Sequence, residues 1–269
     1  MDKSAIKEIS AICKNYGFRK KGNAFFRLHG DGVLQTVKLD YEPSDRTYFL
    51  KIGMKSMYGH LEESYFTSFG CPAFFDAMCF LDPSYYQIKV GFPETFVSGS
   101  STKPLLFINM SQREMPGFQE AVNQAREEMM HRVKTETILD LFQHKVLPQM
   151  EEYKTQQAII TFYEQENSTR KHYDCTYAFL AIGDLNGALD IVNAYINQNE
   201  WAKGQNGIPQ EKWIEDVWYY RKLQLKEMIL SGNEAVTQYL NENYRKNMEM
   251  FEQAFKRKKK TDEATGLIG

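Results

Sequence analysis

The densest run of residues that could do chemistry lies near the N-terminus, between positions 18 and 27. It interleaves basic and aromatic side chains: Phe18, Arg19, Lys20, Lys21, Phe25, Phe26 and Arg27. Basic side chains neutralise phosphates and aromatic rings stack on unpaired bases, so this composition is typical of a nucleic-acid-binding face. The alternative is a solvated basic loop beside aromatic residues of the core. We favour the loop, because one short patch on a weakly acidic chain releases few counterions.

A second set of candidates would serve acid–base chemistry if the fold brought them together. His60, Glu62 and Glu63 form the densest local cluster of titratable groups, and Tyr85 and Tyr86 are a weaker pair. An enzyme whose site is assembled between two parts of the chain would use these residues. A solvated polar loop is the ordinary explanation for such a cluster, so we assign no catalytic residue.

The local motifs of catalysis and metal binding are missing from the sequence. The five histidines form no H-E-x-x-H, the four cysteines form no C-x-x-C, and there is no G-x-S-x-G. Positions 17 and 22 have the glycine spacing of a phosphate loop, but Asn23 and Ala24 stand where such a loop needs Lys and Ser or Thr. We therefore predict no cofactor and no metal site. Catalysis remains an alternative, because triads and carboxylate pairs are often assembled from distant positions.

Composition narrows the class of protein. A hydrophobic share of 42% and a charged share of 25% are ordinary for a globular chain and argue against disorder. The net charge of −2 provides no global attraction for nucleic acid or for an anionic membrane. No apolar run approaches the ~20 residues of a membrane helix, and the first residues show no apolar secretory core. We expect a cytoplasmic protein with reduced thiols that does not span a membrane.

The predicted secondary structure that positions these residues changes near residue 113, from a helix and strands to helices alone. Before that point, apolar spacing predicts a helix over 2–16, and aromatic or β-branched runs predict strands over 24–29, 33–41, 47–54, 87–90 and 105–110. In the strand over 33–41, Gln35 shares one side with Val33, Val37 and Leu39. Residues 1–113 are thus predicted to form an α+β domain, with an N-terminal helix and an antiparallel meander.

After residue 113 the apolar residues recur at helical spacing, which predicts an all-helical bundle over 114–269 with a basic, frayed C-terminal tail. The expected helices include a long one that Pro148 ends or kinks, one starting after Gly183-Asp184, one over 209–230 and one from 233 to about 256. The turns at Gly183 and Gly232 resemble those of helical-hairpin repeats, but they lie 49 residues apart, unlike the ~34 of tetratricopeptide repeats. We expect an irregular bundle, and a separate core for each part.

The N-terminal segment carries a family resemblance. The run from Tyr16 to Arg27, followed by the strand residues Val33 to Leu39 and by Phe49, Ile52 and Gly53, resembles the start of the bacterial family catalogued as domain of unknown function 4304. The resemblance covers about the first fifth of the chain. It implies a helix followed by antiparallel strands and a bacterial cytoplasm, and it implies no activity or catalytic residue.

These observations favour a bacterial cytoplasmic protein that is not an enzyme and that binds another protein, as immunity and adaptor proteins do. Two alternatives stay open. One is nucleic-acid binding through Arg19, Lys20, Lys21 and Arg27, with Phe25 or Phe26 as stacking groups. The other is an enzyme with a site between the two parts. The sequence does not reveal the oligomeric state.

Overall fold

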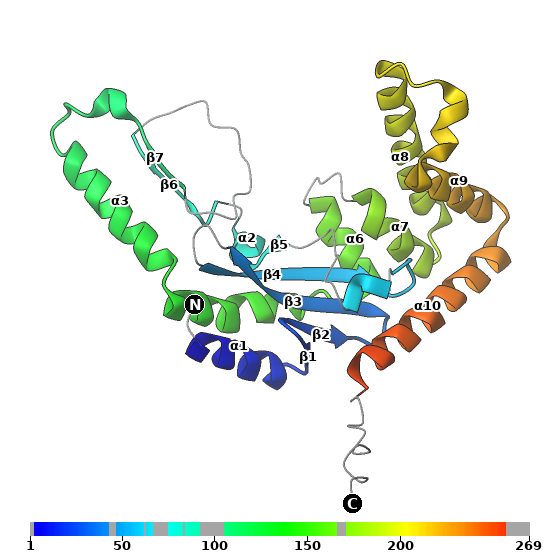
Figure 1. Ribbon diagram of the computed structural model, residues 1–269, viewed down its shortest axis with the longest axis horizontal. Coiled ribbons are helices and arrows are strands. Elements are labelled where there is room, and N and C mark those ends of the chain that lie inside the picture. The colour runs from blue at the N-terminus through cyan, green and yellow to red at the C-terminus, as the bar shows by residue number, and fades with distance from the viewer. Residues whose placement is uncertain are drawn as a thin grey trace, which may run out of the picture.

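The computed structural model describes residues 3–42, 47–61, 63–66, 75–82, 84–91, 105–165 and 171–256 of the 269-residue chain. A helix and an antiparallel sheet come first and a mostly helical part follows (Figure 1), so the predicted α+β class is confirmed. The tail after residue 256 and the predicted candidate Glu62 lie outside the described residues.

The main sheet is an antiparallel meander, as predicted. Helix α1 (Lys3–Asn15) ends just before Gly17, whose φ of 80° is a conformation that glycine adopts without a steric cost. The strands are β1 (Arg19–Lys21), β2 (Ala24–Leu28), β3 (Val33–Glu42), β4 (Thr47–Ser56) and β5 (Phe75–Asp76), and they pair in the order β1-β2-β3-β4-β5. Sequence neighbours are therefore neighbours in the sheet.

A smaller sheet stands apart from the meander. It consists of β6 (Gln87–Val90) and β7 (Leu105–Ile108), which pair in parallel. Both were predicted as strands, but local patterns do not indicate their direction of pairing. Ile88 and Val90 of β6 pack against Val122, Ala125 and Met129 of α3 (Phe118–Arg132), so this sheet and α3 form one arm of the molecule (Figure 1).

The remaining elements of the described residues are helices. Short elements in the first part are η1 (Glu63–Phe66), α2 (Ala77–Leu81) and η2 (Met110–Gln112). After α3 follow α4 (Thr135–Leu141), the π-helical η3 (Phe142–Val146), α5 (Leu147–Met150), α6 (Gln156–Gln165), α7 (Lys171–Ala181), α8 (Leu185–Gln205), the 3-10 helix η4 (Gln210–Glu215), α9 (Val217–Leu230) and α10 (Asn233–Phe255). No helix among the described residues combines the length and the apolar character that crossing a membrane requires.

Two predicted helices differ in detail from the structure. The long helix expected up to Pro148 breaks earlier, between α3 and α4. Helices α4, η3 and α5 then follow one another without interruption to Met150, and Pro148 comes directly after the π-helical η3, where the regular ladder of hydrogen bonds is already altered. The helix expected over 209–230 is divided, because Asp216 leaves helical geometry and caps α9 through the N–H groups of Trp218 and Tyr219. The predicted cap of α8 is confirmed, since Asp184 accepts the N–H of Gly187 at 2.9 Å.

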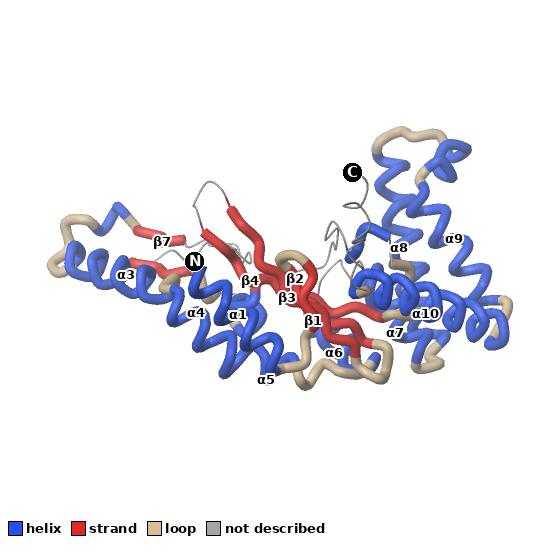
Figure 2. Tube along the Cα trace, turned by 60° about the horizontal axis from the view of Figure 1, so that its bottom comes forward, coloured by secondary structure: helices blue, strands red, loops and turns tan. Residues whose placement is uncertain are grey.

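The expected division into two cores is not what the described residues show. The largest apolar cluster joins Ile9 of α1 and Val37 of β3 to Phe142 of η3 and Ile159 of α6, all fully buried. Figure 2 shows α1, α4 and α5 together along one face of the sheet. On the opposite face, α10 contributes Phe251 to a cluster with sheet residues of β2 and β3. The meander is therefore a middle layer between helices from both ends of the chain.

Candidate functional site

The predicted basic face lies on β1, where its arginine is held by the last turns of α10. Arg19 donates from Nη1 to Glu252 Oε1 at 3.1 Å. Its guanidinium also lies over the rings of Phe255 and Phe251, 4.2 and 5.0 Å from their centroids. These contacts fix the side chain by charge and by cation–π attraction. Arg19 thus joins β1 to the C-terminal helix.

The neighbouring lysines make similar internal contacts. Lys20 Nζ donates to Ser10 Oγ of α1 at 3.1 Å, and Lys21 Nζ donates to the carbonyl of Ala254 in α10 at 2.7 Å. A lysine on one of the last carbonyls of a helix satisfies an acceptor that the helix itself leaves open. The two lysines bind β1 to the helices on either side of it.

The aromatic residues of the same segment are inside the protein. Phe25 is 1% exposed, Phe26 is 1% exposed and Phe18 is 5% exposed. A ring that stacks on a base must be accessible, so none of the three is available in this arrangement. The aromatic residues of segment 18–27 thus belong to the core, as the favoured interpretation expected. The solvated loop of that interpretation is wrong, because Arg19–Lys21 form strand β1 and their side chains bond to α1 and α10.

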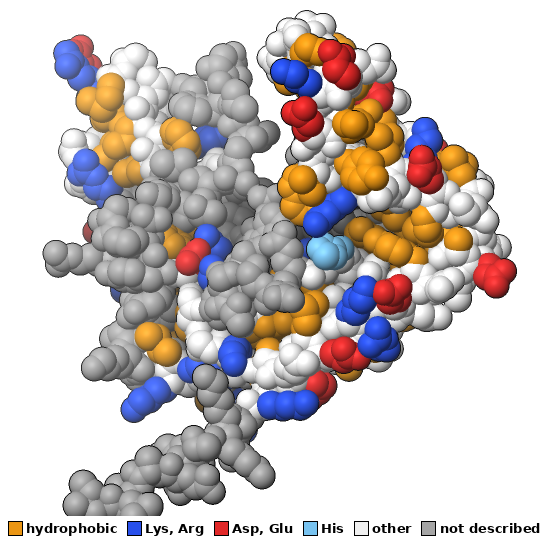
Figure 3. Space-filling model, turned by 45° about the vertical axis from the view of Figure 1, so that its right-hand side comes forward, with side chains coloured by type: hydrophobic (Ala, Val, Ile, Leu, Met, Phe, Trp, Pro, Cys, Tyr) orange, Lys and Arg blue, Asp and Glu red, His pale blue; other side chains and the backbone are white. Residues whose placement is uncertain are grey.

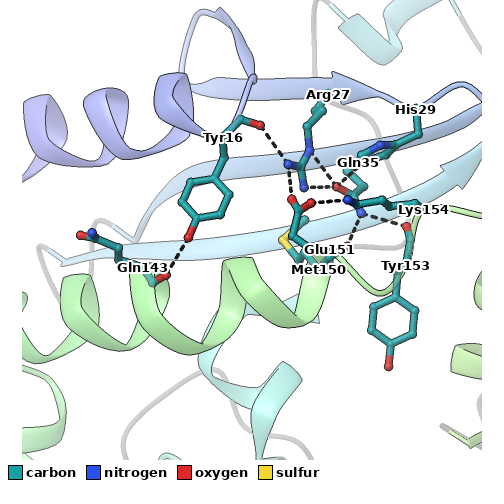
Figure 4. Close-up of polar contacts among 9 residues, drawn as sticks. All are labelled: Tyr16, Arg27, His29, Gln35, Gln143, Met150, Glu151, Tyr153 and Lys154. Atoms are coloured by element: carbon teal, nitrogen blue, oxygen red, sulfur yellow. Dashed lines mark hydrogen bonds and ion pairs between the residues drawn. The ribbon is translucent and has the colours of Figure 1, made fainter.

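Arg27 enters a polar cluster centred on Gln35 of β3 (Figure 4). Gln35 is fully buried, and its amide nitrogen donates to the carbonyls of Met150 at 2.5 Å and Tyr153 at 2.8 Å. Its oxygen accepts from Arg27 Nε at 3.1 Å and from Arg27 Nη2 at 2.6 Å. Both polar atoms of the amide are satisfied, as burial requires.

Glu151 closes the cluster from the other side of Arg27. Arg27 Nη1 forms an ion pair with Glu151 and donates to the carbonyl of Tyr16 at 2.9 Å, while Lys154 Nζ lies 2.5 Å from Glu151 Oε2. Burial alone would raise the pKa of Glu151, but hydrogen bonds from Lys154 and Arg27 and their charges hold this pKa below its ordinary value. Glu151 is a charge partner that stays ionised at neutral pH.

His29 is a further titratable group of this cluster, and its pKa is shifted by its surroundings. Its Nε2 lies 3.0 Å from Gln35 Oε1. Because the amide nitrogen of Gln35 is already donating to two carbonyls, its oxygen faces the ring and the imidazole must donate from Nε2. Burial lowers the pKa of His29, and the charges of Arg27 and Lys154 act in the same direction against the opposing effects of Gln35 and Glu151.

The cluster holds the β2–β3 hairpin to the connection between α5 and α6. A second contact repeats this at the hairpin turn, where Asp31 accepts the backbone N–H of Gln156 through Oδ2 and the Gln156 amide through its carbonyl, both at 2.7 Å. Because these polar groups bond to one another, they hold the β2–β3 hairpin against the connection between α5 and α6. We assign the Gln35 cluster to architecture and not to acid–base chemistry.

The predicted acid–base candidates are placed at different ends of the molecule. His60 is exposed and follows Gly59, whose carbonyl accepts from Asn247 of α10. Tyr85 donates to the carbonyl of Arg132 at the end of α3, and Tyr86 is buried in the core. Glu63 lies in η1. Helices α3 and α10 lie on opposite sides of the molecule (Figure 1), so these residues do not converge on one site.

The buried thiols and the acidic residues offer little reactive chemistry. Cys13 and Cys175 are buried thiols that form no disulfide, and burial raises the pKa of Cys13 to about 12, which suppresses the nucleophilic thiolate. Within the described ranges, no group of three or more His, Cys, Asp or Glu side chains is arranged to hold a metal ion.

More than half of the exposed large apolar side chains among the described residues lie between positions 201 and 220, near one end of the α8–α9 hairpin. We call it the hairpin tip and define it by six residues of α8, η4, α9 and the loop before η4: Trp201, Ile208, Ile214, Val217, Trp218 and Tyr220. Their exposed fractions are 68%, 40%, 61%, 58%, 46% and 47%. Figure 3 shows hydrophobic side chains along this protruding arm, interspersed with acidic and basic ones. Exposed large apolar side chains that gather in one place mark interaction surfaces.

The hairpin tip is held in shape by buried contacts beneath it. Lys203 of α8 pairs with Asp216 at 3.1 Å and lies 4.2 Å from the centroid of the Tyr219 ring. Tyr219 in turn donates to Glu200 at 2.6 Å. These links join α8 to the start of α9 and to η4. The exposed side chains are therefore displayed on an ordered support.

Sequence reasoning did not single out the hairpin tip. One signal was present, since all three tryptophans of the chain, at 201, 213 and 218, lie within 18 residues. The periodicity of α8 and α9 concealed it, because apolar residues in a helix are buried by default. The Gln35 cluster was missed as well, since residues that pair in it, such as Arg27 and Glu151, are 124 positions apart in the sequence.

Comparisons of the chain with family models, with curated proteins and with solved structures find no match. The resemblance of residues 16–53 to the 4304 family therefore stays a prediction.

Proposed function

We propose that this chain is a non-enzymatic protein-binding module, immunity- or adaptor-like, and that the hairpin tip is its contact surface. The observation that carries the proposal is the distribution of exposed apolar side chains. Of eleven large hydrophobic residues that are exposed among the described residues, six lie between positions 201 and 220. Such a concentration in a short segment favours recognition of a partner over random surface composition.

The residue types at the hairpin tip also favour binding to protein. Tryptophan, tyrosine and arginine dominate the energetics of protein–protein interfaces, and the tip presents Trp201, Trp218 and Tyr220 with Arg221 over the ring of Trp218 at 5.2 Å. A catalytic site would need converging titratable groups, which the candidate residues His60 and Tyr85 do not provide. Binding is the function that this surface supports best.

The proposal also includes the cellular location and the family of the protein. A bacterial cytoplasm and kinship with the 4304 family rest on the sequence of residues 16–53 and on the helix-then-meander order that this segment adopts. Both are consistent with buried thiols at Cys13 and Cys175 that form no disulfide.

Recovery of partners from the native host tests the proposal. Purified tagged protein serves as bait in three forms: wild type, the double variant Trp201→Ser/Trp218→Ser, and the control Leu230→Ser. Leu230 is 63% exposed at the far end of α9, so the control removes a comparable apolar side chain elsewhere. We expect a stoichiometric partner with wild type and control, and its loss with the double variant. Equal recovery with all three forms would contradict the proposal, and circular dichroism verifies that each form is folded.

A further inference from the structure

The outer side of β7 is the edge of a very small sheet. Among the described residues, β6 and β7 pair only with each other, and a two-stranded sheet is marginal without further cover. Helix α3 covers one face of it. Ile88 and Val90 of β6 are buried against α3, and Leu106 and Ile108 of β7 pack there half-buried. The arm is thus a helix-backed sheet of the smallest size.

The hydrogen bonds between the two strands show which residues of β7 face outward. The backbone N–H of Asn109 donates to the carbonyl of Val90 in β6 at 2.9 Å. Backbone groups alternate in direction along a strand, so those of Phe107 also point to β6, whereas the N–H and C=O groups of Leu106 and Ile108 point away from it. Within the described part of the chain, no strand pairs with that side of β7.

The side chains of this edge carry none of the usual protection against strand pairing. Natural edge strands are guarded by charged residues, by proline or by bulges. β7 has the sequence Leu-Leu-Phe-Ile, without charge or proline, and its register with β6 is regular over all four residue pairs. The edge is therefore suited to receive another strand, which supplies N–H and C=O groups at the matching spacing.

A second copy of β7, running antiparallel, complements this edge. When a two-fold axis passes between the two Phe107 residues, Leu106 of each copy lies opposite Ile108 of the other. Both are then hydrogen-bonded pairs that exchange two bonds each. All outward N–H and C=O groups of Leu106 and Ile108 in both copies are paired in this register, because an isologous contact is self-complementary.

The side chains that meet across this axis match as well. Phe107 lies opposite its own copy in a non-hydrogen-bonded pair, where side chains approach most closely, and aromatic pairs across strands are stabilising. Leu106 lies opposite Ile108 on the face that α3 covers. A strand of another protein would have to supply an apolar, aromatic, apolar triplet, which every copy of this chain carries. The sequence of β7 thus favours a second copy as the occupant.

The helices behind the sheet are compatible with this pairing. Helix α3 packs over both strands, and neighbouring strands are ~4.8 Å apart, so the two copies of α3 lie about 10 Å apart on one face of the joined sheet. Packed helices are separated by roughly 8 to 10 Å. The arm of α3, β6 and β7 and the α8–α9 hairpin project from opposite sides of the molecule (Figure 1, Figure 2), so the hairpin tips stay apart from this contact.

We propose that the chain dimerises by antiparallel pairing of β7 with β7 of a second copy. The pairing joins two sheets of two strands into one sheet in the order β6-β7-β7-β6, with both copies of α3 on the same face. The interface lies on a different part of the molecule from the hairpin tip, so it stands or falls independently of the proposed binding function. A strand of another protein at this edge is the competing outcome of the test.

Sedimentation equilibrium of the full chain at increasing concentration measures the association. We expect the average mass of the wild type to rise from one chain towards two. Ile108→Pro removes an N–H that points away from β6, and with it half of the hydrogen bonds between the copies, so it should weaken association at least tenfold. The control Ile108→Ala loses packing against α3 but keeps the N–H, and it should still dimerise. Near-ultraviolet circular dichroism verifies that each variant is folded.

Three results would overturn the proposal. The wild type stays monomeric, or the proline variant dimerises like the alanine variant. In the third, the purified wild type is monomeric, and another protein is recovered from the native host with Ile108→Ala but not with Ile108→Pro, which would assign the edge to a foreign strand.

A cysteine at position 107 tests the register. Opposite residues of a non-hydrogen-bonded pair have Cα atoms about 4.5 Å apart, within the range that a disulfide spans. Phe107→Cys should therefore give a disulfide-linked dimer under mild oxidation, which non-reducing electrophoresis detects. Gln157→Cys, at an exposed position of α6, and the wild type with its native cysteines are the controls and should not cross-link. Equal cross-linking of Gln157→Cys, or none of Phe107→Cys while the wild type dimerises, overturns the pairing about Phe107.

Discussion

Gln35 illustrates how a single polar residue ties distant segments together. It occupies an inward position of β3, beside Val37, where an apolar residue would be the ordinary choice. It is tolerated because its amide is fully hydrogen-bonded. The amide nitrogen donates to the carbonyls of Met150 and Tyr153, and the amide oxygen accepts from the guanidinium of Arg27. The cost of burying the amide is offset only while all of these partners are present.

Replacing Gln35 tests this account. Gln35→Leu keeps the volume but leaves two buried carbonyls and the Arg27 donors without their partner, so we expect the free energy of unfolding to fall by roughly 3 kcal/mol. Urea denaturation followed by circular dichroism measures the change. The control Gln157→Leu replaces an exposed glutamine of α6 and should change stability by less than about 0.5 kcal/mol. A small effect at both positions would mean that the cluster contributes little.

His29 gives the cluster a pH dependence with a definite sign. Its pKa in the folded protein is lowered from the ordinary value of 6.5, chiefly by burial and by the charge of Arg27. Between 6.5 and the lowered value, the unfolded chain binds more protons than the folded one, so stability decreases as the pH falls through this window. We expect a plot of unfolding free energy against pH to be steeper for wild type than for His29→Gln between pH 7 and about 5. Parallel curves would show that His29 does not titrate differently on folding.

At the scale of elements, the basic residues of β1 act as ties between helices and the sheet. Arg19 and Lys21 reach the last turns of α10, and Lys20 reaches α1. A three-residue edge strand has few hydrogen bonds of its own, so side-chain ties of this kind stabilise its position. The basic side chains that suggested contacts with phosphates therefore bond to groups of the protein itself.

The start of α9 depends on one cap. Asp216 accepts from the N–H groups of Trp218 and Tyr219 and pairs with Lys203, and these contacts outweigh burial and lower the pKa of Asp216. The stabilisation is therefore present above the unfolded pKa and is lost as the pH falls through the lowered one.

Two substitutions separate the cap of α9 from the ion pair. Asp216→Ala removes both and should cost about 1 to 2 kcal/mol, whereas Asp216→Asn keeps the cap and should cost clearly less. Thermal unfolding gives the stabilities, and hydrogen exchange should show faster opening of residues 210–220 in the alanine variant. Asp190→Ala, on the exposed face of α8, serves as the control. Equal losses for the alanine and asparagine variants would assign the effect to the ion pair alone.

At the scale of the whole molecule, the change of secondary structure near residue 113 does not coincide with a division of the core. Ile9 and Val37 on one side of that boundary share a cluster with Phe142 and Ile159 on the other. Each part removes the other's apolar surface from water. The residues of this cluster need both parts for their burial, whereas a second cluster around Val192 and Leu225 is made mainly by the helical part itself.

Separating the chain at residue 113 tests this dependence. The fragments 1–113 and 114–269, expressed alone, should lack cooperative thermal unfolding, whereas the full chain should unfold in one transition. Mixing the two fragments should recover part of the near-ultraviolet circular dichroism, which reports packed aromatic rings. Cooperative unfolding of either fragment by itself would contradict the shared core and favour two independent domains.

The sequence by itself determined the local features of this protein. Periodicity and turn residues identified α1, the strands β2, β3 and β4, the hairpin turn at 30–32, the strands β6 and β7 and the capped start of α8, because these depend on contacts between near neighbours in the chain. The short edge strands β1 and β5 were not predicted. The breaks after α3 and before α9 were missed, since an apolar period continues across them.

Only the tertiary structure decided which side chains are buried and which meet. It placed Phe25 inside the protein and Trp201 outside, although both belong to apolar patterns. It brought Gln35 to carbonyls more than a hundred positions away and parted His60 from Tyr85. Such contacts depend on how whole elements pack. The spacing of residues along one strand or helix does not indicate which residues of another element lie opposite.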